Sequence, residues 1–437
     1  MHLNRRGVSF LNLRLRSSRS QNPRLNGGFD GSGPEPRLGE DRRRRLKMRI
    51  AFIGARGIPH GHSSAEQIAL HVGRRLVQRG HEFTVYCRRN LFVDRSPTYQ
   101  GVRRVFLPTI EHKLLGQVIH GFLAGIHSAA RPYDVVHAQC LTNTFQSVLP
   151  WLIRRNVVIN VNGQEWDNPK WPRTLRHAFF KAAARTTLLM CGEIITDAEG
   201  MRAIYRERYG RDSTVIAYGA DLVQSRERSI LTQYGLEPSR YYFVAARLVP
   251  SNQIRNIVEA FQAAGTGRVL AIAGGGDTES GYYRALRAAA GPKVRFLGLI
   301  SDQAHMDELY ANAYAYLHGA TLGGINSALL RPLGAGCPAI AADTPFNREV
   351  LERDDGTRCG STWRDDAELR DAIRVFEGDL RLVESLREPC RQQIRQHFSW
   401  DLVTDQYEVF YRGFVERWPV ERIRAEVAAQ KGKYARA

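Results

Sequence analysis

The 437-residue chain lacks any run of about 20 uninterrupted apolar residues, which a membrane-spanning helix requires. Its most apolar windows, residues 115–126 and 186–195, are too short or are interrupted by His and Glu. We therefore expect a soluble, cytoplasmic protein that is at most peripheral at the inner face of a membrane.

Cysteine and histidine patterns typical of metal or redox sites are also missing. The six cysteines are scattered through apolar segments, and none shows the paired spacing of zinc or redox motifs. The 13 histidines are dispersed without ligand spacing. The sequence therefore predicts a reduced protein with buried cysteines, no metal and no bound cofactor.

Acidic residues are scarce relative to basic ones, with 44 Asp and Glu against 63 Lys and Arg and a net charge of +19. This excess predicts an acidic partner such as phosphate, nucleic acid or anionic lipid. Residues 1–47 hold twelve of the basic and four of the acidic residues, and this leader ends where a strand begins at Met48. It is interpreted as a disordered basic arm, a transit-like presequence or, preferably, a mis-assigned start upstream of Met48.

Motifs of several large classes are absent. No helix-turn-helix, zinc finger or basic stripe with interleaved aromatics is present, so nucleic acid is not an expected partner. Neither Gly-x-Gly-x-x-Gly nor a phosphate-loop lysine motif follows a strand, which disfavours ordinary dehydrogenases and ATPases.

What the chain does contain from Met48 onward is an alternation of short apolar strands and helical segments. Residues 64–79 carry apolar side chains at helical spacing and end at Gly80. This alternation predicts α/β structure, with strands at residues 49–53, 83–87, 103–107, 134–137, 157–161, 193–196, 214–218, 242–246, 269–273, 294–297, 315–317 and 339–342.

The strands fall into two series separated by the polar stretch 221–240. We predict an N-terminal Rossmann-like domain over 48–225, a second Rossmann-like domain over 226–398, and a helix with a tail over 399–437. Ligands of open α/β sheets bind beyond the carboxyl ends of the strands, so the predicted active site is a cleft between the two sheets.

Several motifs along the chain together resemble one family. They are Gly54–Pro59, Asn162–Trp166 with Lys170 and Trp171, Tyr218–Ala220, Ala246–Pro250, Gly323–Asn326 and Asp343–Glu349. Their order and spacing over residues 48–415 resemble the rhamnosyltransferase-like branch of the family-4 retaining glycosyltransferases. Phe398–Asp401 and the following helix resemble that family's closing helix, which crosses back to the first domain. The resemblance implies the GT-B fold, two tandem Rossmann-like domains facing a cleft.

The resemblance also implies a donor site for a nucleotide-sugar. Arg247 matches the family's phosphate-binding arginine, which would stabilise the leaving diphosphate, whereas a strand-end surface arginine is the alternative. Asn326 is predicted as the N-cap of a helix whose free amides face a phosphate. The implied donor-binding residues are Gly54, Gly57, Arg247, Asn252, Leu297, Gly323, Gly324, Ile325, Asn326 and Arg331.

Several positions depart from the family pattern. Arg331 stands where the family places a glutamate that accepts hydrogen bonds from the donor ribose, and an arginine has no acceptor. Asn252 lacks the second positive charge of the wider family. Gln139 stands at a common histidine position and cannot shuttle a proton near neutral pH. Asn162 replaces an aspartate or histidine.

The first domain supplies the predicted acceptor site. The candidate catalytic residues are Arg247, Glu165 and Gln139, and the candidate acceptor-binding residues are Glu66, Asn162 and Trp166. Acids such as Glu66 and Glu165 could orient an acceptor hydroxyl, although exposed loop acids are an equally good interpretation. Trp166 could stack on a sugar or anchor the two domains.

Two functional hypotheses follow. The first is a retaining hexosyl or deoxyhexosyl transferase that uses a nucleotide-sugar and a glycan or lipid-linked acceptor in cell-surface polysaccharide synthesis. The second is a catalytically degenerate glycosyltransferase-like subunit that binds a glycan or a partner enzyme. Arg331 is the residue that most favours the second hypothesis.

Overall fold

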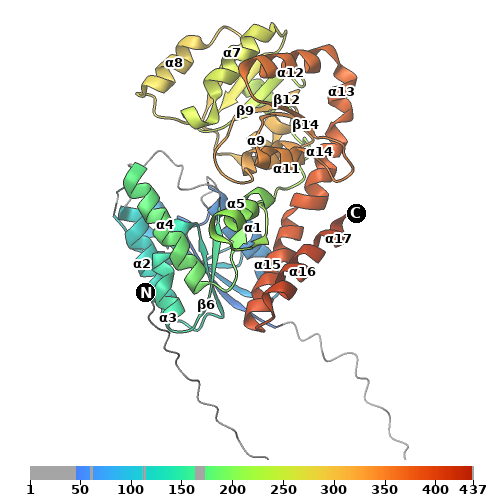
Figure 1. The fold of residues 1–437 in the computed structure, drawn as a ribbon. Helices are drawn as coiled ribbons and strands as arrows, with labels where there is room; N and C mark the ends of the chain where they lie inside the picture. Colours follow the sequence, from blue (N-terminus) through green and yellow to red (C-terminus); the bar gives the residue numbers. More distant parts are fainter. Residues whose placement is uncertain (1–45, 60–62, 111, 113–114, 163–172, 436–437) are drawn as a thin grey trace, which may run out of the picture. The chain divides into compact units, whose positions relative to one another are not determined.

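A computed structural model describes residues 46–59, 63–110, 112, 115–162 and 173–435. Its first sheet has eight strands in the order β3-β4-β2-β1-β5-β6-β7-β8, all parallel to their neighbours except β3. Figure 1 shows the fold as a ribbon, with β6 of this sheet labelled. The strands are β1 (Arg49–Ile53), β2 (Glu82–Arg88), β3 (Thr98–Tyr99), β4 (Val102–Leu107), β5 (Val135–Gln139), β6 (Asn156–Val161), β7 (Ile195–Thr196) and β8 (Thr214–Val215).

The second sheet has six strands, all parallel, in the order β11-β10-β9-β12-β13-β14. They are β9 (Tyr241–Ala245), β10 (Val269–Ala273), β11 (Val294–Gly298), β12 (Ala315–His318), β13 (Ala339–Ala342) and β14 (Gly360–Trp363). Two parallel-sheet α/β halves of this kind confirm the predicted GT-B fold class.

Two strands are missing from the sequence prediction. β3 is a two-residue antiparallel edge strand, which is too short to show a pattern. β14 has the sequence Gly-Ser-Thr-Trp, so it has no apolar run. The predicted strand at 214–218 is also too long, because only Thr214 and Val215 pair with β7.

Most of the strands are connected by helices. The helices are α1 (Ser64–Gln78), α2 (Leu115–Ala129), α3 (Val148–Leu152), α4 (Arg173–Met190), α5 (Glu199–Tyr209), α6 (Ile230–Gln233), α7 (Ile254–Ala264), α8 (Gly281–Ala289), α9 (Gln303–Ala311), α10 (Ser327–Gly334), α11 (Pro345–Leu351), α12 (Asp366–Gly378), α13 (Leu380–Ser385), α14 (Arg387–Gln393), α15 (Trp400–Val415), α16 (Val420–Ala429) and α17 (Lys431–Tyr434).

The C-terminal helix α15 packs against α1 and the first sheet, as the resemblance implies. Arg79, the residue after α1, forms an ion pair of 2.7 Å with Asp405. Deeper in the interface, the Tyr411 hydroxyl lies 2.7 Å from His137 Nδ1 on β5. The end of the chain is therefore part of the structure that supports the first sheet.

The central strands of both sheets supply the core. β5 is buried over its whole length, and β12 and β13 are buried on both faces. Five of the six cysteines are buried and all six are free thiols. No helix in the described ranges is long and apolar enough to cross a membrane.

Candidate active site at the carboxyl ends of the sheets

The turn after β1 lies directly on the end of β5. Gly54 has φ of +115°, a conformation that favours glycine. A Cβ at Gly54 would lie 2.7 Å from the carbonyl oxygen of Gln139. Gly57, in the same turn, packs against Phe92 in the same close manner. Both predicted glycines therefore let the backbone of this turn pack closely. The groups that it packs against are other residues of the protein.

Gln139 lies at the carboxyl end of β5 and is fully buried. Its Oε1 is 3.2 Å from His137 Nε2, whereas its Nε2 has no hydrogen-bond partner among the described residues. Burial lowers the pKa of His137 to about 3, so this imidazole is neutral near pH 7. The catalytic role of Gln139 stays a prediction, and the structure places the amide below the surface of the site.

Glu66 closes the first turn of α1. Its Oε2 accepts a hydrogen bond of 2.9 Å from the Ser63 amide, which forms a capping box. Its Oε1 accepts one of 2.8 Å from Arg56 Nε. The side chain is only 1% exposed, so Glu66 is not an exposed loop acid. Its carboxylate holds the turn that contains Gly54 and Gly57.

Arg56 and Arg88, neither of which was predicted as a site residue, stand beside this carboxylate. Arg88 is the last residue of β2, and burial lowers its pKa, with a further contribution from the charge of Arg56. Arg88 donates a short hydrogen bond to Gln117 Oε1, and Gln117 Nε2 donates to Asn143 at 3.3 Å. The position of Arg88 at the carboxyl end of a strand could have indicated from the sequence that it lies near the site.

The chain after β6 holds Asn162. Its Nδ2 donates a short hydrogen bond to the hydroxyl of Tyr218, and its Oδ1 has no partner in the described part of the chain. Burial raises the pKa of Tyr218 well above its usual value, and the charge of Asp197 adds to this shift. Glu165 and Trp166, also predicted for this loop, lie outside the described residues.

Asp197 brings the two sheets' turns together. It follows β7, and a Cβ on Gly324 would clash with its carboxylate. Gly324 belongs to the Gly-Gly turn before α10, so glycine is required there for a close approach between the two halves. Sequence reasoning missed Asp197, although its position after a strand could have indicated it.

The Gly-Gly turn leads into α10 as predicted. Asn326 caps the helix, because its side-chain oxygen accepts a hydrogen bond of 2.9 Å from the Ala328 amide. Ile325 is 3% exposed and anchors the turn, whereas Gly323 has φ of +110° and open space around it. The N-cap prediction is confirmed, and phosphate binding by this turn stays a prediction.

Arg247 follows β9 and is exposed. No ion pair to its side chain is found in the described ranges. Asn252 Nδ2 donates a hydrogen bond of 2.8 Å to the Arg247 carbonyl, so it fixes the backbone of this turn. Leu297, predicted to lie beside the nucleotide base, is half-buried in β11. The second sheet thus presents an available cation at its carboxyl edge.

Arg331 sits in the second turn of α10. Its Nη2 lies 3.9 Å from Asp307 Oδ1 and is buried without a hydrogen bond to any described residue. Its guanidinium carbon is 5.4 Å from the ring centre of Tyr310. Burial raises the pKa of Asp307, and the charge of Arg331 opposes this shift. Asp307 of α9 therefore compensates the positive charge of Arg331 only in part.

Metal binding has no support in the described ranges, where no cluster of three or more His, Cys, Asp or Glu could hold an ion. The predictions of no metal and no cofactor stay predictions. A pocket lined by Asn156 and Val157 lies at the amino end of β6, away from these carboxyl-end turns.

Comparisons with known proteins agree with this geometry. Residues 65–224 match the family described as Glycosyltransferase Family 4, and residues 229–397 match Glycosyl transferases group 1. No curated protein matches the chain significantly. The predicted domain boundaries at 225/226 and 398/399 stay predictions.

Solved structures share the fold. Sucrose-phosphate synthase from Thermosynechococcus elongatus aligns with a TM-score of 0.72 and 16% identity, covering 85% of this chain and 100% of that one. Anabaena HepE with UDP-glucose aligns at 0.65 and 16%, covering 82% and 98%. Starch synthase IV from Arabidopsis thaliana with ADP and acarbose aligns at 0.65 and 13%, covering 85% and 100%.

The two family matches and the fold shared with solved glycosyltransferase structures agree with each other. Residues 65–224 and 229–397 each match a glycosyltransferase family model, and the chain has the GT-B fold.

Proposed function

We propose that the chain is a retaining transferase that moves a hexosyl or deoxyhexosyl group from a nucleotide-sugar to a glycan or lipid-linked acceptor in cell-surface polysaccharide synthesis. The observation that carries the proposal is the exposed Arg247 at the carboxyl edge of the second sheet, within a chain matched by two glycosyltransferase families. An exposed arginine in such a turn can form charge-assisted hydrogen bonds with a diphosphate.

In this proposal the second sheet binds the donor. Arg247 and the amides at the start of α10 stabilise the diphosphate as the bond between the sugar's anomeric carbon and the phosphate oxygen breaks. The leaving oxygen accepts the proton of the acceptor hydroxyl, and the new glycosidic bond forms on the same face of the sugar. This route needs neither a protein nucleophile nor a metal ion.

The donor is proposed to be a UDP-, dTDP- or GDP-linked sugar. HepE with UDP-glucose and starch synthase IV with ADP support a nucleotide-sugar in general, because both share this fold. A rhamnosyl-type donor and a place at the inner face of the membrane are finer parts of the proposal. They rest on the motifs of the sequence.

The first sheet is proposed to receive the acceptor through Glu66, Asn162 and Trp166, with Glu165 and Gln139 near the reacting hydroxyl. Glu66 already binds Arg56 and the Ser63 amide. Its contribution is therefore to hold the turn against which the acceptor lies. Asn162, with a free acceptor oxygen in the described part, is better placed to bind a sugar hydroxyl.

A second candidate is a glycosyltransferase-like subunit that binds a glycan or partner enzyme without turnover. The observation that favours it is Arg331, a partly balanced guanidinium at the position where the resemblance places a ribose-binding carboxylate. Such a group cannot accept hydrogen bonds from ribose hydroxyls.

Titration calorimetry with UDP, dTDP and GDP separates the two candidates. The full chain should bind at least one diphosphate more tightly than inorganic pyrophosphate, and the Arg331→Glu variant provides the comparison. Wild-type binding supports the transferase. Binding by Arg331→Glu alone would support the degenerate subunit. If neither protein binds a diphosphate, the assignment of a donor site to the second half is contradicted under both candidate functions.

A further inference from the structure

Helix α2 lies at the surface yet carries no Asp, Glu, Lys or Arg in its 15 residues. Its inner face, which includes His120 and Ala124, is buried. Its outer face leaves Leu115, Phe122 and Ile126 exposed by 52, 47 and 54%. Spacings of seven and four residues place these side chains on one stripe. Surface helices normally carry charges on such a stripe, so α2 presents an apolar strip to its surroundings.

The neighbouring helix α3 continues this apolar surface. α2 sits close to the segment that leads into α3, because a Cβ on Gly125 would clash with the carbonyl oxygen of Gln146. Nine of the 17 exposed large apolar side chains of the described chain fall within residues 110–189, so exposure is concentrated here. We call this the α2–α3 surface, formed by Leu115, Phe122, Ile126, Leu149, Trp151 and Leu152.

The charged side chains of the two helices in the α2–α3 surface, of the residue after α3 and of the following helix α4 (Arg173–Met190) are all basic. Helices α2, α3 and α4 contain no acidic residue. Arg154, which follows α3, and Lys181 and Arg185 of α4 are exposed. By contrast, α12 of the second half carries four acidic and two basic residues. An apolar surface with a basic border is complementary to an anionic, partly apolar partner.

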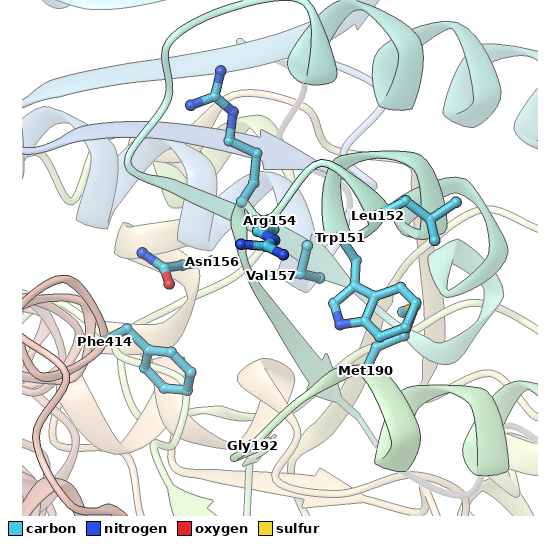
Figure 2. Close-up of a pocket in the computed structure, with 9 residues that line it drawn as sticks. Trp151, Leu152, Arg154, Asn156, Val157, Met190, Gly192 and Phe414 are labelled. Carbon is cyan, nitrogen blue, oxygen red and sulfur yellow. The ribbon is translucent and has the colours of Figure 1, made fainter. Parts of the chain in front are cut away.

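A pocket of about 450 Å³ adjoins this surface (Figure 2). Trp151 and Leu152 of α3 line it together with Met190 and Phe414, which are apolar. Arg154 and Arg155 line it as well, and Arg155 Nε is buried without a hydrogen bond to any described residue. The pocket therefore joins apolar walls to a cationic group, as a phospholipid with an anionic headgroup would require.

We propose that the α2–α3 surface docks onto a bilayer containing anionic phospholipids. The apolar side chains of α2 and α3 enter the headgroup region, and Arg154, Lys181 and Arg185 contact lipid phosphates. A stripe from Leu115 to Ile126 is about 16 Å long at the helical rise, so it can lie flat on the membrane.

This surface is also connected to the predicted acceptor site. Gln117, two residues after Leu115, binds Arg88 and Asn143 at the carboxyl ends of the first sheet. A membrane on α2 would thus hold a lipid-linked acceptor near that site. This last step rests on the proposed function, whereas docking itself does not.

Vesicle co-sedimentation of the full chain tests the docking. Binding to an equimolar mixture of phosphatidylcholine and phosphatidylglycerol should exceed binding to phosphatidylcholine alone. Phe122→Ser combined with Ile126→Ser should weaken binding about tenfold, because two inserted apolar side chains are lost. Val375→Ser with Leu380→Ser is the matched control, since these residues are 58 and 55% exposed in the second half and should leave binding unchanged. Equal binding by both double variants would overturn the proposal.

Fluorescence separates insertion of this surface from electrostatic attraction of the basic residues 1–47, which contain no Trp. Brominated lipids in anionic vesicles should quench the wild-type protein more than the Trp151→Phe variant. No difference between the two would overturn the proposal, as would a lipid-free dimer that Phe122→Ser with Ile126→Ser converts to a monomer. Unchanged nucleotide binding by that double variant would show that it folds and would keep this test distinct from the donor-site test.

Discussion

The polar groups at the carboxyl ends of the two sheets differ in exposure to solvent and in whether they already have partners within the protein. In the first sheet, Glu66 and Gln139 are buried, and the carboxylate of Glu66 is fully engaged within the protein. In the second sheet, Arg247 is exposed and its side chain forms no ion pair in the described ranges. A preformed cationic edge therefore faces a half whose polar residues mainly hold their own turns.

This difference has a physical meaning for a two-substrate enzyme. A diphosphate is recognised by its charge, so an exposed arginine and free amides are sufficient to bind it. An acceptor hydroxyl needs oriented neutral and acidic groups, and these must first be placed by a rigid turn. Glu66 and Gly54 provide that rigidity instead of direct contacts.

The largest expected effect is on the first-sheet turn. Gly54→Ala should destabilise the protein by about 2–5 kcal/mol, because it adds backbone strain and forces a Cβ against Gln139 and Asn143. Gly80→Ala is the matched control, with φ of +94° and no atom within 4 Å of its Cβ, and should cost about 1 kcal/mol. Urea unfolding measures both values. Similar losses in both variants would show that the first-sheet turn is not tightly packed.

The next effect concerns the second sheet. Arg247→Ala should weaken nucleoside-diphosphate binding about 10- to 100-fold, because a charge-assisted hydrogen bond contributes about 1.5–3 kcal/mol. Arg255→Ala removes another exposed arginine, which pairs with Glu259, and it should leave affinity unchanged. Calorimetry with the diphosphate that binds wild type gives the ratio. Equal affinities for both variants would place the phosphate elsewhere.

Local patterns were sufficient to predict much of this fold. Alternating apolar segments located most strands to within a residue or two, and the N-cap at Asn326 followed from its position before an apolar helix. Such features depend on neighbours along the chain. The partners of Arg331 could not be predicted in this way, because Asp307 and Tyr310 come from another helix.

The same limit applies to surfaces. The apolar window from Leu115 to Ile126 is visible in the sequence, but its pattern does not say which side is covered. Only packing of the Gly125 backbone on Gln146 decides that Phe122 and Ile126 face outward. Asp197 beside Gly324 is a third case, since the contact joins turns that follow strands of different sheets.

A smaller effect tests whether α15 supports the first sheet. Burial would raise the pKa of Glu408, but hydrogen bonds from His81 and Arg79 outweigh it and lower the pKa to about 2. A lowered carboxyl pKa stabilises the fold above its unfolded value of about 4.5, and this contribution is lost as pH falls towards 2. Glu408→Gln should remove up to about 2 kcal/mol of the change in unfolding free energy between pH 6 and pH 3. Glu416→Gln is the control, and an unchanged pH profile in Glu408→Gln would contradict the assignment.

The smallest expected effect is a gain on the second sheet. Asn252→Lys restores the second positive charge of the wider family beside Arg247, at the cost of the hydrogen bond from Asn252 to the Arg247 carbonyl. These opposing changes should leave a net increase in diphosphate affinity of about three- to tenfold, which is largest at low salt. Asn256→Lys, in the first turn of α7, adds the same charge four residues further along the chain and should change affinity less than twofold by calorimetry. If both lysines raise affinity equally, the diphosphate responds to the overall field of the second half and not to a clamp at Arg247.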